Sequence, residues 1–234
     1  MNRKMIWAAQ LAAVLLCALA LKVYYSTATP DELLWILAPT TTLVELLSGR
    51  AFAFESYTGY MSSDHKFVIA VPCAGVNFLL TAFLMLSLRR LWRERLQGVN
   101  WRFIPITMAM AYVATLIANT VRICIALEIQ RRSIEVSWLS DNQLHRLEGI
   151  VVYFGFLLLL FMLTERFESG RRWLLFPLVV YYATTLGIPI VNGSLRQGMP
   201  FFEHFVFVLV MPLITVVPFA LIQPRMRRLR VPSE

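Results

Sequence analysis

The chain is poor in charged residues. Only 15% of its 234 residues are charged, and 58% are hydrophobic. Soluble domains of this size carry about 25% charged residues. One water-soluble core of this length cannot bury so much apolar surface. The composition therefore excludes an ordinary soluble domain and predicts an all-α, polytopic membrane bundle.

Cysteine is also scarce, and its spacing excludes several kinds of site. The three cysteines, Cys17, Cys73 and Cys124, are isolated, without a CxxC pair or a Cys/His ligand pattern. This pattern indicates neither a disulfide framework nor a zinc site. We expect neither a metal nor a cofactor. The net charge of +8 sits in short clusters between apolar runs, a pattern typical of membrane topology rather than of nucleic-acid binding.

Six apolar runs are long enough to cross a membrane, which takes about 20 residues each. The first run has no convincing cleavage site behind it, so we expect a retained span rather than a signal peptide. The predicted spans are Met5–Leu21, Phe67–Leu88, Phe103–Leu127, Leu144–Leu163, Trp173–Val191 and Phe205–Ile222.

The distribution of Lys and Arg orients these spans. With the N-terminus in the cytoplasm, the cytoplasmic segments hold 14 of the 22 Lys and Arg residues, and the outer segments hold 7 in far more sequence. The last one, Arg122, lies inside a span. Positive residues accumulate on the cytoplasmic side, so the bias predicts six spans with both termini inside.

We expect residues 1–234 to form one integral membrane domain. Between the first two spans, residues 29–66 begin with the helix-start pattern Thr29-Pro30-Asp31-Glu32. Pro39 and a threonine triplet interrupt the segment, which favours short helices lying at the outer interface over a full crossing.

The stretch "VIAVPCAGVNFLL", residues 68–80, interrupts an apolar run with polar and small residues. Pro72 suits the first turn of a helix, so we expect Cys73 at a helix N-terminus, where free N–H groups favour a thiolate. Gly75 would allow close approach, and Asn77 would share the face of Cys73. The alternative is that Cys73 is a small apolar side chain in the bundle.

Arg122 lies within the third predicted span, with Asn119 one turn earlier on the same face. An arginine in hydrocarbon costs at least about 2.5 kcal/mol and normally marks a functional site. The alternative is that the side chain extends to the outer interface, about 7 Å away. Cys124 is on another face, and we interpret it as a packing residue.

His145 lies close to the start of the fourth span, for which Ser140, Asp141 or Asn142 is the expected cap. Gly149 is four residues further on the same face. His145 could equally be a solvated loop histidine. His65 and His204 also lie in predicted outer segments, so they are rivals for any catalytic role.

The predicted topology brings Cys73, Arg122 and His145 to the outer part of the membrane on three different spans. A thiol, a base and a cation are the groups that cysteine acyl transfer needs. The histidine would take the thiol proton, and the arginine would stabilise a thiolate or the developing oxyanion.

At these residues the chain resembles the exosortase/archaeosortase family, and its short length resembles the compact members, of the exosortase K type. The family pattern is a cysteine, a small residue and glycine, then N-x-x-R, then a histidine a few residues before a glycine. In this chain the three parts are Cys73-Ala74-Gly75, Asn119-Thr120-Val121-Arg122 and His145-Arg146-Leu147-Glu148-Gly149.

The resemblance implies a membrane cysteine protease or transpeptidase of the bacterial cytoplasmic membrane, with residues 67–163 as its catalytic core. Its substrates would end in a short motif, one transmembrane helix and a basic tail. Cys73 would be the nucleophile, His145 the general acid and base, and Arg122 the oxyanion or thiolate stabiliser. Cleavage at the outer face would pass the product to an unknown acceptor, which could be a lipid, a glycan or water.

Two other classes of function fit the same residues. In the first, the protein is a non-enzymatic carrier or accessory subunit in which Arg122 binds an anion and Cys73 only packs. In the second, it is a purely hydrolytic intramembrane protease. Removal of the Cys73 thiol distinguishes the first from an enzyme, and the chemistry of the product C-terminus distinguishes the second from a transferase.

Overall fold

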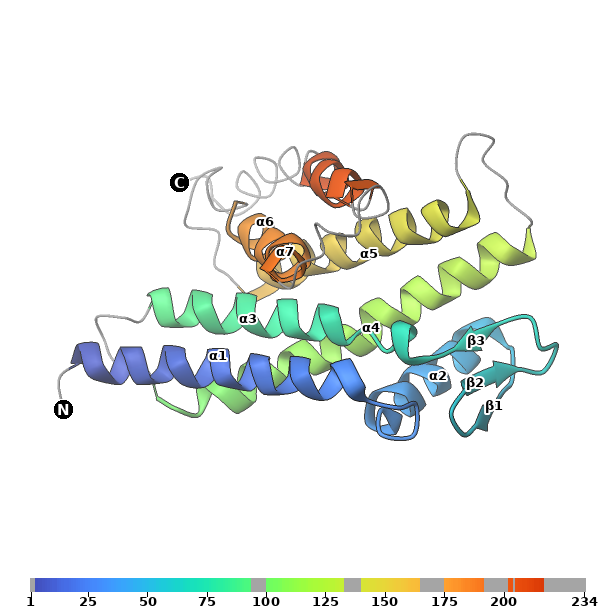
Figure 1. Ribbon diagram of the computed structural model, residues 1–234, viewed down its shortest axis with the longest axis horizontal. Coiled ribbons are helices and arrows are strands. Elements are labelled where there is room, and N and C mark those ends of the chain that lie inside the picture. The colour runs from blue at the N-terminus through green and yellow to red at the C-terminus, as the bar shows by residue number, and fades with distance from the viewer. Residues whose placement is uncertain are drawn as a thin grey trace, which may run out of the picture. The chain divides into compact units, whose positions relative to one another are not determined.

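The computed structural model describes residues 3–93, 100–132, 140–164, 175–191, 202–203 and 205–216. The described chain is mostly helical (Figure 1). It divides into two compact units, Met1–Trp138 and Leu139–Glu234. Cys73 and Arg122 belong to the first unit and His145 to the second.

Three long helices form the frame of the first unit: α1 (Arg3–Thr27), α3 (Val76–Arg93) and α4 (Phe103–Arg131). Helix α3 packs against both α1 and α4. It is also the most buried of the three, with 72% of its apolar window inside the protein against 11% for α1. Helix α3 is therefore the centre of this unit.

Hydrogen bonds between the helices fix their directions. The Trp7 indole N–H donates to the Leu91 carbonyl at 3.1 Å, so the start of α1 lies beside the end of α3. The hydroxyls of Ser87 and Thr107 are 2.8 Å apart, which joins the end of α3 to the start of α4. The helices alternate in direction, so the end of α1 and the start of α3 lie on the same side as the second half of α4, which extends beyond them (Figure 1).

The predicted helix-start pattern between the first two spans makes its hydrogen bonds, but it starts a turn, and the helix that follows has Leu33 as its N-cap with no side-chain cap bond. The Thr29 N–H donates to a Glu32 carboxylate oxygen at 2.8 Å, and the Glu32 N–H donates to the Thr29 hydroxyl at 3.4 Å. This is a reciprocal capping box, which satisfies donors that the first helical turn leaves free. A turn follows, and α2 runs over Leu34–Ser48.

Pro39 does not end α2, although the sequence predicted several short helices here. A proline lacks the N–H that would bond the carbonyl four residues earlier, which is that of Trp35. The Tyr112 hydroxyl of α4 donates to this carbonyl at 2.6 Å, and the Trp35 and Tyr112 rings stack with centroids 5.9 Å apart. A residue of α4 thus supplies the bond that the proline removes.

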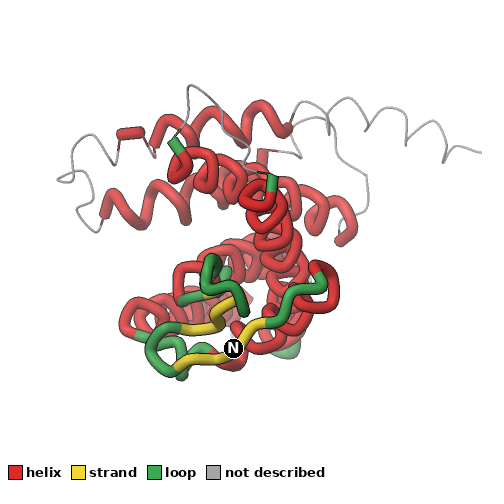
Figure 2. Tube along the Cα trace, turned by 90° about the vertical axis from the view of Figure 1, so that its right-hand side faces the viewer, coloured by secondary structure: helices red, strands yellow, loops and turns green. Residues whose placement is uncertain are grey.

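A small antiparallel sheet follows α2, which the sequence analysis did not predict. Its order is β1 (Phe52–Glu55), β2 (Gly59–Ser62) and β3 (Val68–Ile69). Gly59 faces Ile69 so closely that a Cβ atom would lie 2.5 Å from its carbonyl oxygen. Figure 2 looks onto the end of the protein that carries these strands. The chain thus reaches Cys73 directly from a sheet.

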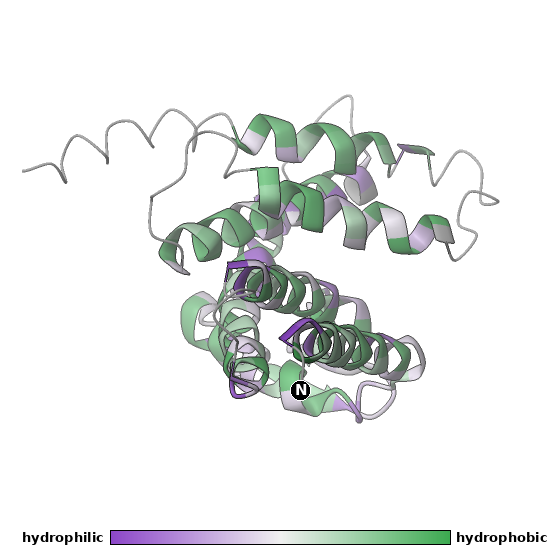
Figure 3. Ribbon diagram, turned by 90° about the vertical axis from the view of Figure 1, so that its left-hand side faces the viewer, coloured by the Kyte–Doolittle hydropathy of each residue, from purple (hydrophilic) through white to green (hydrophobic). Residues whose placement is uncertain are grey.

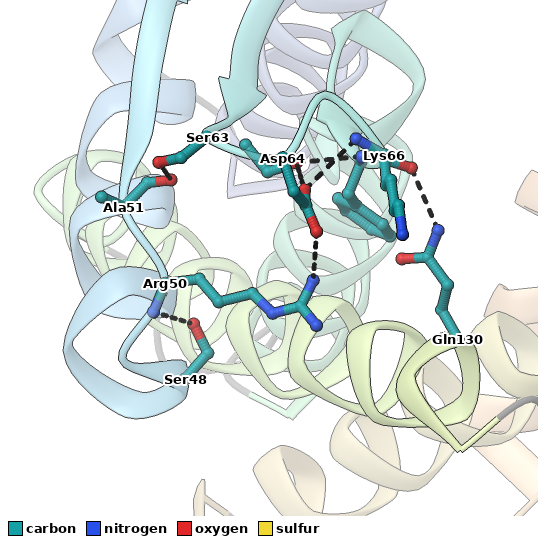
Figure 4. A network of polar contacts seen from close by, with 9 residues as sticks. Ser48, Arg50, Ala51, Ser63, Asp64, Lys66 and Gln130 are labelled. Carbon is teal, nitrogen blue, oxygen red and sulfur yellow. Dashed lines mark hydrogen bonds and ion pairs between the residues drawn. The ribbon is translucent and has the colours of Figure 1, made fainter.

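A polar network ties the β2–β3 loop to its surroundings (Figure 4). The Asp64 carboxylate accepts hydrogen bonds from the Ser62 hydroxyl at 2.6 Å and from the Lys66 N–H at 3.2 Å, and it lies 3.7 Å from the Arg50 guanidinium. The Gln130 amide near the end of α4 donates to the Lys66 carbonyl at 3.0 Å. These contacts fix the loop that leads into β3.

The second unit contains α5 (Asp141–Thr164), α6 (Leu175–Tyr182), a π-helical turn, η3 (Ala183–Gly187), α7 (Ile188–Val191) and a helix over Phe205–Val216. Aromatic rings join α5 to α6. The centroids of Phe154 and Tyr181 are 5.1 Å apart, and those of Phe161 and Phe176 are 5.8 Å apart. The Tyr182 hydroxyl donates to the Leu209 carbonyl at 2.6 Å.

Four helical stretches are long and apolar enough to cross a membrane: Arg3–Thr27, Val71–Arg93, Phe103–Arg131 and Gln143–Thr164. Figure 3 shows that hydrophobic residues cover most of the helical ribbon. These stretches contain the first four predicted spans, except that residues 67–70 are extended rather than helical. The last two predicted spans fall on shorter apolar helices, Leu175–Ile190 and Phe205–Val216. The described chain is thus that of a helical membrane protein.

Candidate active site

Cys73 lies in a short turn between the sheet and α3. It ends the 3₁₀ turn η1 (Val71–Cys73), and α3 begins only at Val76. Gly75 separates the two with a φ of 73°, a left-handed conformation that favours glycine because it has no Cβ atom. The Cys73 side chain is half-buried.

The prediction that Cys73 occupies the first turn of the membrane helix is wrong. That prediction required a continuous helix from Pro72, and Gly75 interrupts it. The Cys73 N–H donates to the Ala70 carbonyl at 2.8 Å, and the Ala74 N–H donates to the Val71 carbonyl at 3.0 Å. These N–H groups are therefore occupied within the turn, and the argument from a helix N-terminus does not apply to the thiol.

The turn docks onto α4 through Asn119. The Asn119 side-chain amide is fully buried and donates to the Cys73 carbonyl at 2.6 Å. A Cβ atom on Gly75 would lie 3.1 Å from Cγ of Asn119 and 3.2 Å from Cγ2 of Thr115. Gly75 therefore allows close approach, as the sequence predicted, and the group that approaches is α4. Two predicted supporting residues meet here, around the backbone of Cys73.

Arg122 follows Asn119 by one turn on the buried side of α4, where its exposure is 9%. Helix α4 continues to Arg131, nine residues further, or about 13 Å at 1.5 Å per residue. The side chain therefore lies inside the protein and further from the helix end than the predicted five residues. This burial does not fit the alternative of a side chain extended to the interface.

Tyr25, near the end of α1, is a site residue that the sequence analysis missed. Its hydroxyl donates to the Val71 carbonyl at 3.2 Å, and the same hydroxyl interacts electrostatically with Cys73 and Arg122. Tyr24 and Tyr25 together end an apolar run, as aromatic residues at a membrane interface commonly do. The sequence does not show which of the two belongs to the site. In the fold, the Tyr24 hydroxyl donates to the Glu32 carbonyl instead.

A continuous helix would place Asn77 on the same face as Cys73, but Asn77 does not face Cys73. Its side chain is exposed, and its amide oxygen accepts a hydrogen bond from the Lys22 ammonium at 2.9 Å. With Gly75 in a left-handed conformation, four residues no longer correspond to one helical turn. Asn77 thus joins α1 to α3, beside the contact between Tyr25 and Val71.

His145 lies on the second turn of α5, and Ser140 is the cap, one of the three predicted. The Ser140 N–H donates to the Gln143 side chain at 3.0 Å, and the Gln143 N–H donates to the Ser140 hydroxyl at 3.4 Å. The His145 side chain is 47% exposed, and its Nδ1 lies 3.3 Å from a carboxylate oxygen of Glu148. The sequence analysis did not identify Glu148. Gly149 is buried next to it.

The other candidate residues have simpler surroundings. The Nδ1 atom of His65 lies 2.8 Å from the sulfur of Met61 in the β2–β3 loop, and His204 lies outside the described residues. Cys17 is exposed on α1, and Cys124 is half-buried on α4. Within the described part of the chain, no group of three or more His, Cys, Asp or Glu residues is arranged to hold a metal ion.

The structure thus brings together Cys73, Gly75, Asn119 and Arg122 in the first unit and adds Tyr25. It pairs His145 with Glu148 on α5 of the second unit. No protein-family model, no curated protein and no solved structure matches this chain. The chemistry of these residues is therefore the basis for a functional proposal.

Proposed function

We propose that this protein is a membrane cysteine transpeptidase or protease of the exosortase/archaeosortase type, with Cys73 as its nucleophile. The observation that carries the proposal is the 2.6 Å hydrogen bond from buried Asn119 to the carbonyl of Cys73. It fixes the cysteine against the helix whose next turn carries buried Arg122. Burying an amide is costly unless it is hydrogen-bonded, so this bond to the backbone of Cys73 holds the turn in one position, as the placement of a reacting thiol requires.

The reaction would follow the order of cysteine acyl transfer. The thiol proton of Cys73 passes to His145, and the sulfur attacks the scissile carbonyl carbon. Arg122 stabilises the tetrahedral oxyanion. The carbon–nitrogen bond then breaks, and the departing amine takes the proton from His145. A thioester remains on Cys73, and an acceptor hydroxyl, amine or water displaces it.

The substrate class follows from the family resemblance and from the membrane setting. A substrate would present a short motif just outside its single transmembrane helix, and the basic tail of that helix would lie in the cytoplasm. The substrate helix leaves with the amine product. The acylated product goes to a lipid, a glycan or water.

The proposed topology has six spans, with both termini in the cytoplasm and the site on the outer side of a bacterial cytoplasmic membrane. The Lys and Arg bias supports this orientation. The alternating directions of α1, α3 and α4 support it as well, because they put the turn of Cys73 at the same end as the second half of α4.

The test is removal of the Cys73 thiol. A tagged substrate that ends in a motif, an apolar helix and a basic tail is co-expressed with Cys73→Ala or Cys73→Ser. Both variants are expected to lose processing while they still insert in the membrane. Cys17→Ala and Cys124→Ala are the matched controls and are expected to process normally.

Processing by Cys73→Ala would refute the nucleophile and favour the carrier or accessory subunit. Mass spectrometry of the released product then decides between transfer and hydrolysis. A free carboxylate at the new C-terminus indicates hydrolysis, and an added lipid, glycan or amine indicates transfer.

A further inference from the structure

Glu148 is a buried carboxylate on the membrane helix α5. Its side chain is 6% exposed, and neither oxygen has a hydrogen-bond partner among the described residues. One basic group lies beside it, the His145 imidazole, whose Nδ1 is 3.3 Å from Oε2. The other carboxylates with described ion pairs, Asp64 and Glu128, are far more exposed, at 45% and 42%.

The burial of the Glu148 carboxylate is energetically costly. Removing a charged group from water without compensation is strongly unfavourable. Glu148 and His145 are three residues apart on one helix, so they occupy neighbouring positions on the same face. The helix brings the buried acid to the more exposed base with no loop between them.

The contact also bears on which imidazole nitrogen carries the proton. A neutral histidine carries its proton on one nitrogen, and a negative charge beside one nitrogen favours the tautomer with the proton there. With the carboxylate next to Nδ1, the proton belongs on Nδ1, and Nε2 keeps its lone pair. That is the nitrogen a general base must present.

We propose that Glu148 is a positioning residue that holds His145 as the Nδ1–H tautomer, so that Nε2 is the nitrogen that accepts a proton. This inference rests on the proposed function, in which His145 is the base. It adds a fourth residue to the Cys73, Arg122 and His145 set. The pair begins two residues after the Ser140–Gln143 capping box, which fixes the start of the helix that orients it.

The first test reads the tautomer directly and needs no activity. The chain has three histidines, so ¹⁵N-histidine labelling in detergent gives few signals, and loss of one in His145→Ala identifies His145. We expect the Nδ1–H form in the wild type and a shift toward Nε2–H in Glu148→Met, which keeps the length of the side chain. Glu148→Asp retains a carboxylate and is expected to keep the wild-type tautomer. An unchanged tautomer in Glu148→Met overturns the proposal.

The second test measures turnover of the tagged substrate. Glu148→Met is expected to lower kcat by about 10- to 100-fold, the range for loss of a residue that orients another, and to leave KM within about twofold. Glu148→Asp should recover part of the loss. The matched control is Glu128→Met, at the exposed end of α4, which should turn over normally. Glu148→Met removes the buried group of the pair, and the His145 side chain that remains is 47% exposed and can be solvated, so misfolding is not the expected cause of the loss.

The outcomes separate this inference from the proposed function. If Cys73→Ala is inactive but Glu148→Met has the kcat of Glu128→Met, the positioning role is refuted and the enzyme assignment stands. If Cys73→Ala still processes substrate, the enzyme assignment fails, and with it the catalytic role of Glu148.

Discussion

Asn119 and Tyr25 both bind backbone carbonyls of the turn that carries Cys73, and neither is adjacent to it in sequence. The two side chains come from α4 and α1, so two helices determine where the thiol lies. Such positioning is what a nucleophile requires, because small displacements of reacting groups cost large factors in rate.

Substitution of Arg122 tests whether its shape matters as well as its charge. Arg122→Lys is expected to lower kcat by about 10²-fold, the usual loss when one oxyanion donor is removed. The physical reason is that a lysine lacks the planar set of donors of a guanidinium. The measurement is the rate of processing of the tagged substrate by variant protein at equal membrane abundance.

The control for this substitution is Arg132→Lys, at the exposed end of α4, which should retain the wild-type rate. Near-normal turnover by Arg122→Lys would show that a positive charge alone is sufficient.

Gly75 has the most restricted backbone in the site. Gly75→Ala is expected to destabilise the protein by about 1–2 kcal/mol, because an L-residue is strained at positive φ, and its Cβ would crowd Asn119. Thermal unfolding in detergent measures the loss. The matched control is Gly155→Ala on α5, where a Cβ meets nothing within 4 Å. That variant is expected to be neutral or more stable, since alanine favours a helix. Equal stability of the two variants would contradict the argument.

At the scale of the element, the Asp64 carboxylate stabilises the β2–β3 loop of the small sheet. The Ser62 hydroxyl, the Lys66 N–H and Arg50 stabilise the Asp64 carboxylate, so the pKa of Asp64 lies below its ordinary value of 3.8. A lowered pKa means that the folded loop binds the proton less tightly than the unfolded chain. The stabilisation is therefore complete above about pH 5 and is lost as the pH falls through the folded pKa.

Hydrogen exchange of the Lys66 and Phe67 amides, corrected for the intrinsic effect of pH, measures this loop. We expect protection that is constant near neutral pH and decreases below about pH 4. Asp64→Asn should have low protection at every pH. If the wild-type amides were equally protected at pH 3 and pH 7, the Asp64 carboxylate would not be what stabilises the loop.

Local patterns predicted some elements and not others. The apolar runs predicted the four long helices. Ser140, one of three candidate caps, starts α5, whereas the pattern at Thr29 starts only the turn before α2. The sheet was missed although Phe52 and Phe54 alternate with exposed Ala53 and Glu55, because its strands are only two to four residues long. Short strands carry little periodic signal.

Local sequence patterns also predicted only part of the candidate site. Cys73 and Arg122 stand out locally, because a polar residue within an apolar run is visible in the sequence, and His145 lies in the polar stretch that starts its span. Tyr25 and Glu148 do not stand out, since a tyrosine at a helix end and a glutamate in a helical turn are ordinary. Their surroundings depend on packing and burial, which spacing alone does not give.

At the scale of the whole molecule, the orientation in the membrane is directly testable. In a variant with all three cysteines replaced, Tyr57→Cys introduces a thiol at a position that is 84% exposed, between β1 and β2. A membrane-impermeant thiol reagent is expected to label it in intact cells. Trp101→Cys, just before α4, should be labelled only after permeabilisation. The opposite pattern would invert the proposed topology.

The left-handed Gly75 also has a mechanical consequence. The turn of Cys73 is fastened to α1 and α4 by side chains, whereas it is joined to α3 by a residue with no side chain to resist rotation. A tilt of α3 against α1 and α4 would therefore have to be accommodated at Gly75, the one residue between the turn and α3 with a left-handed backbone. The bonds from Tyr25 and Asn119 would then hold the turn of Cys73 in place.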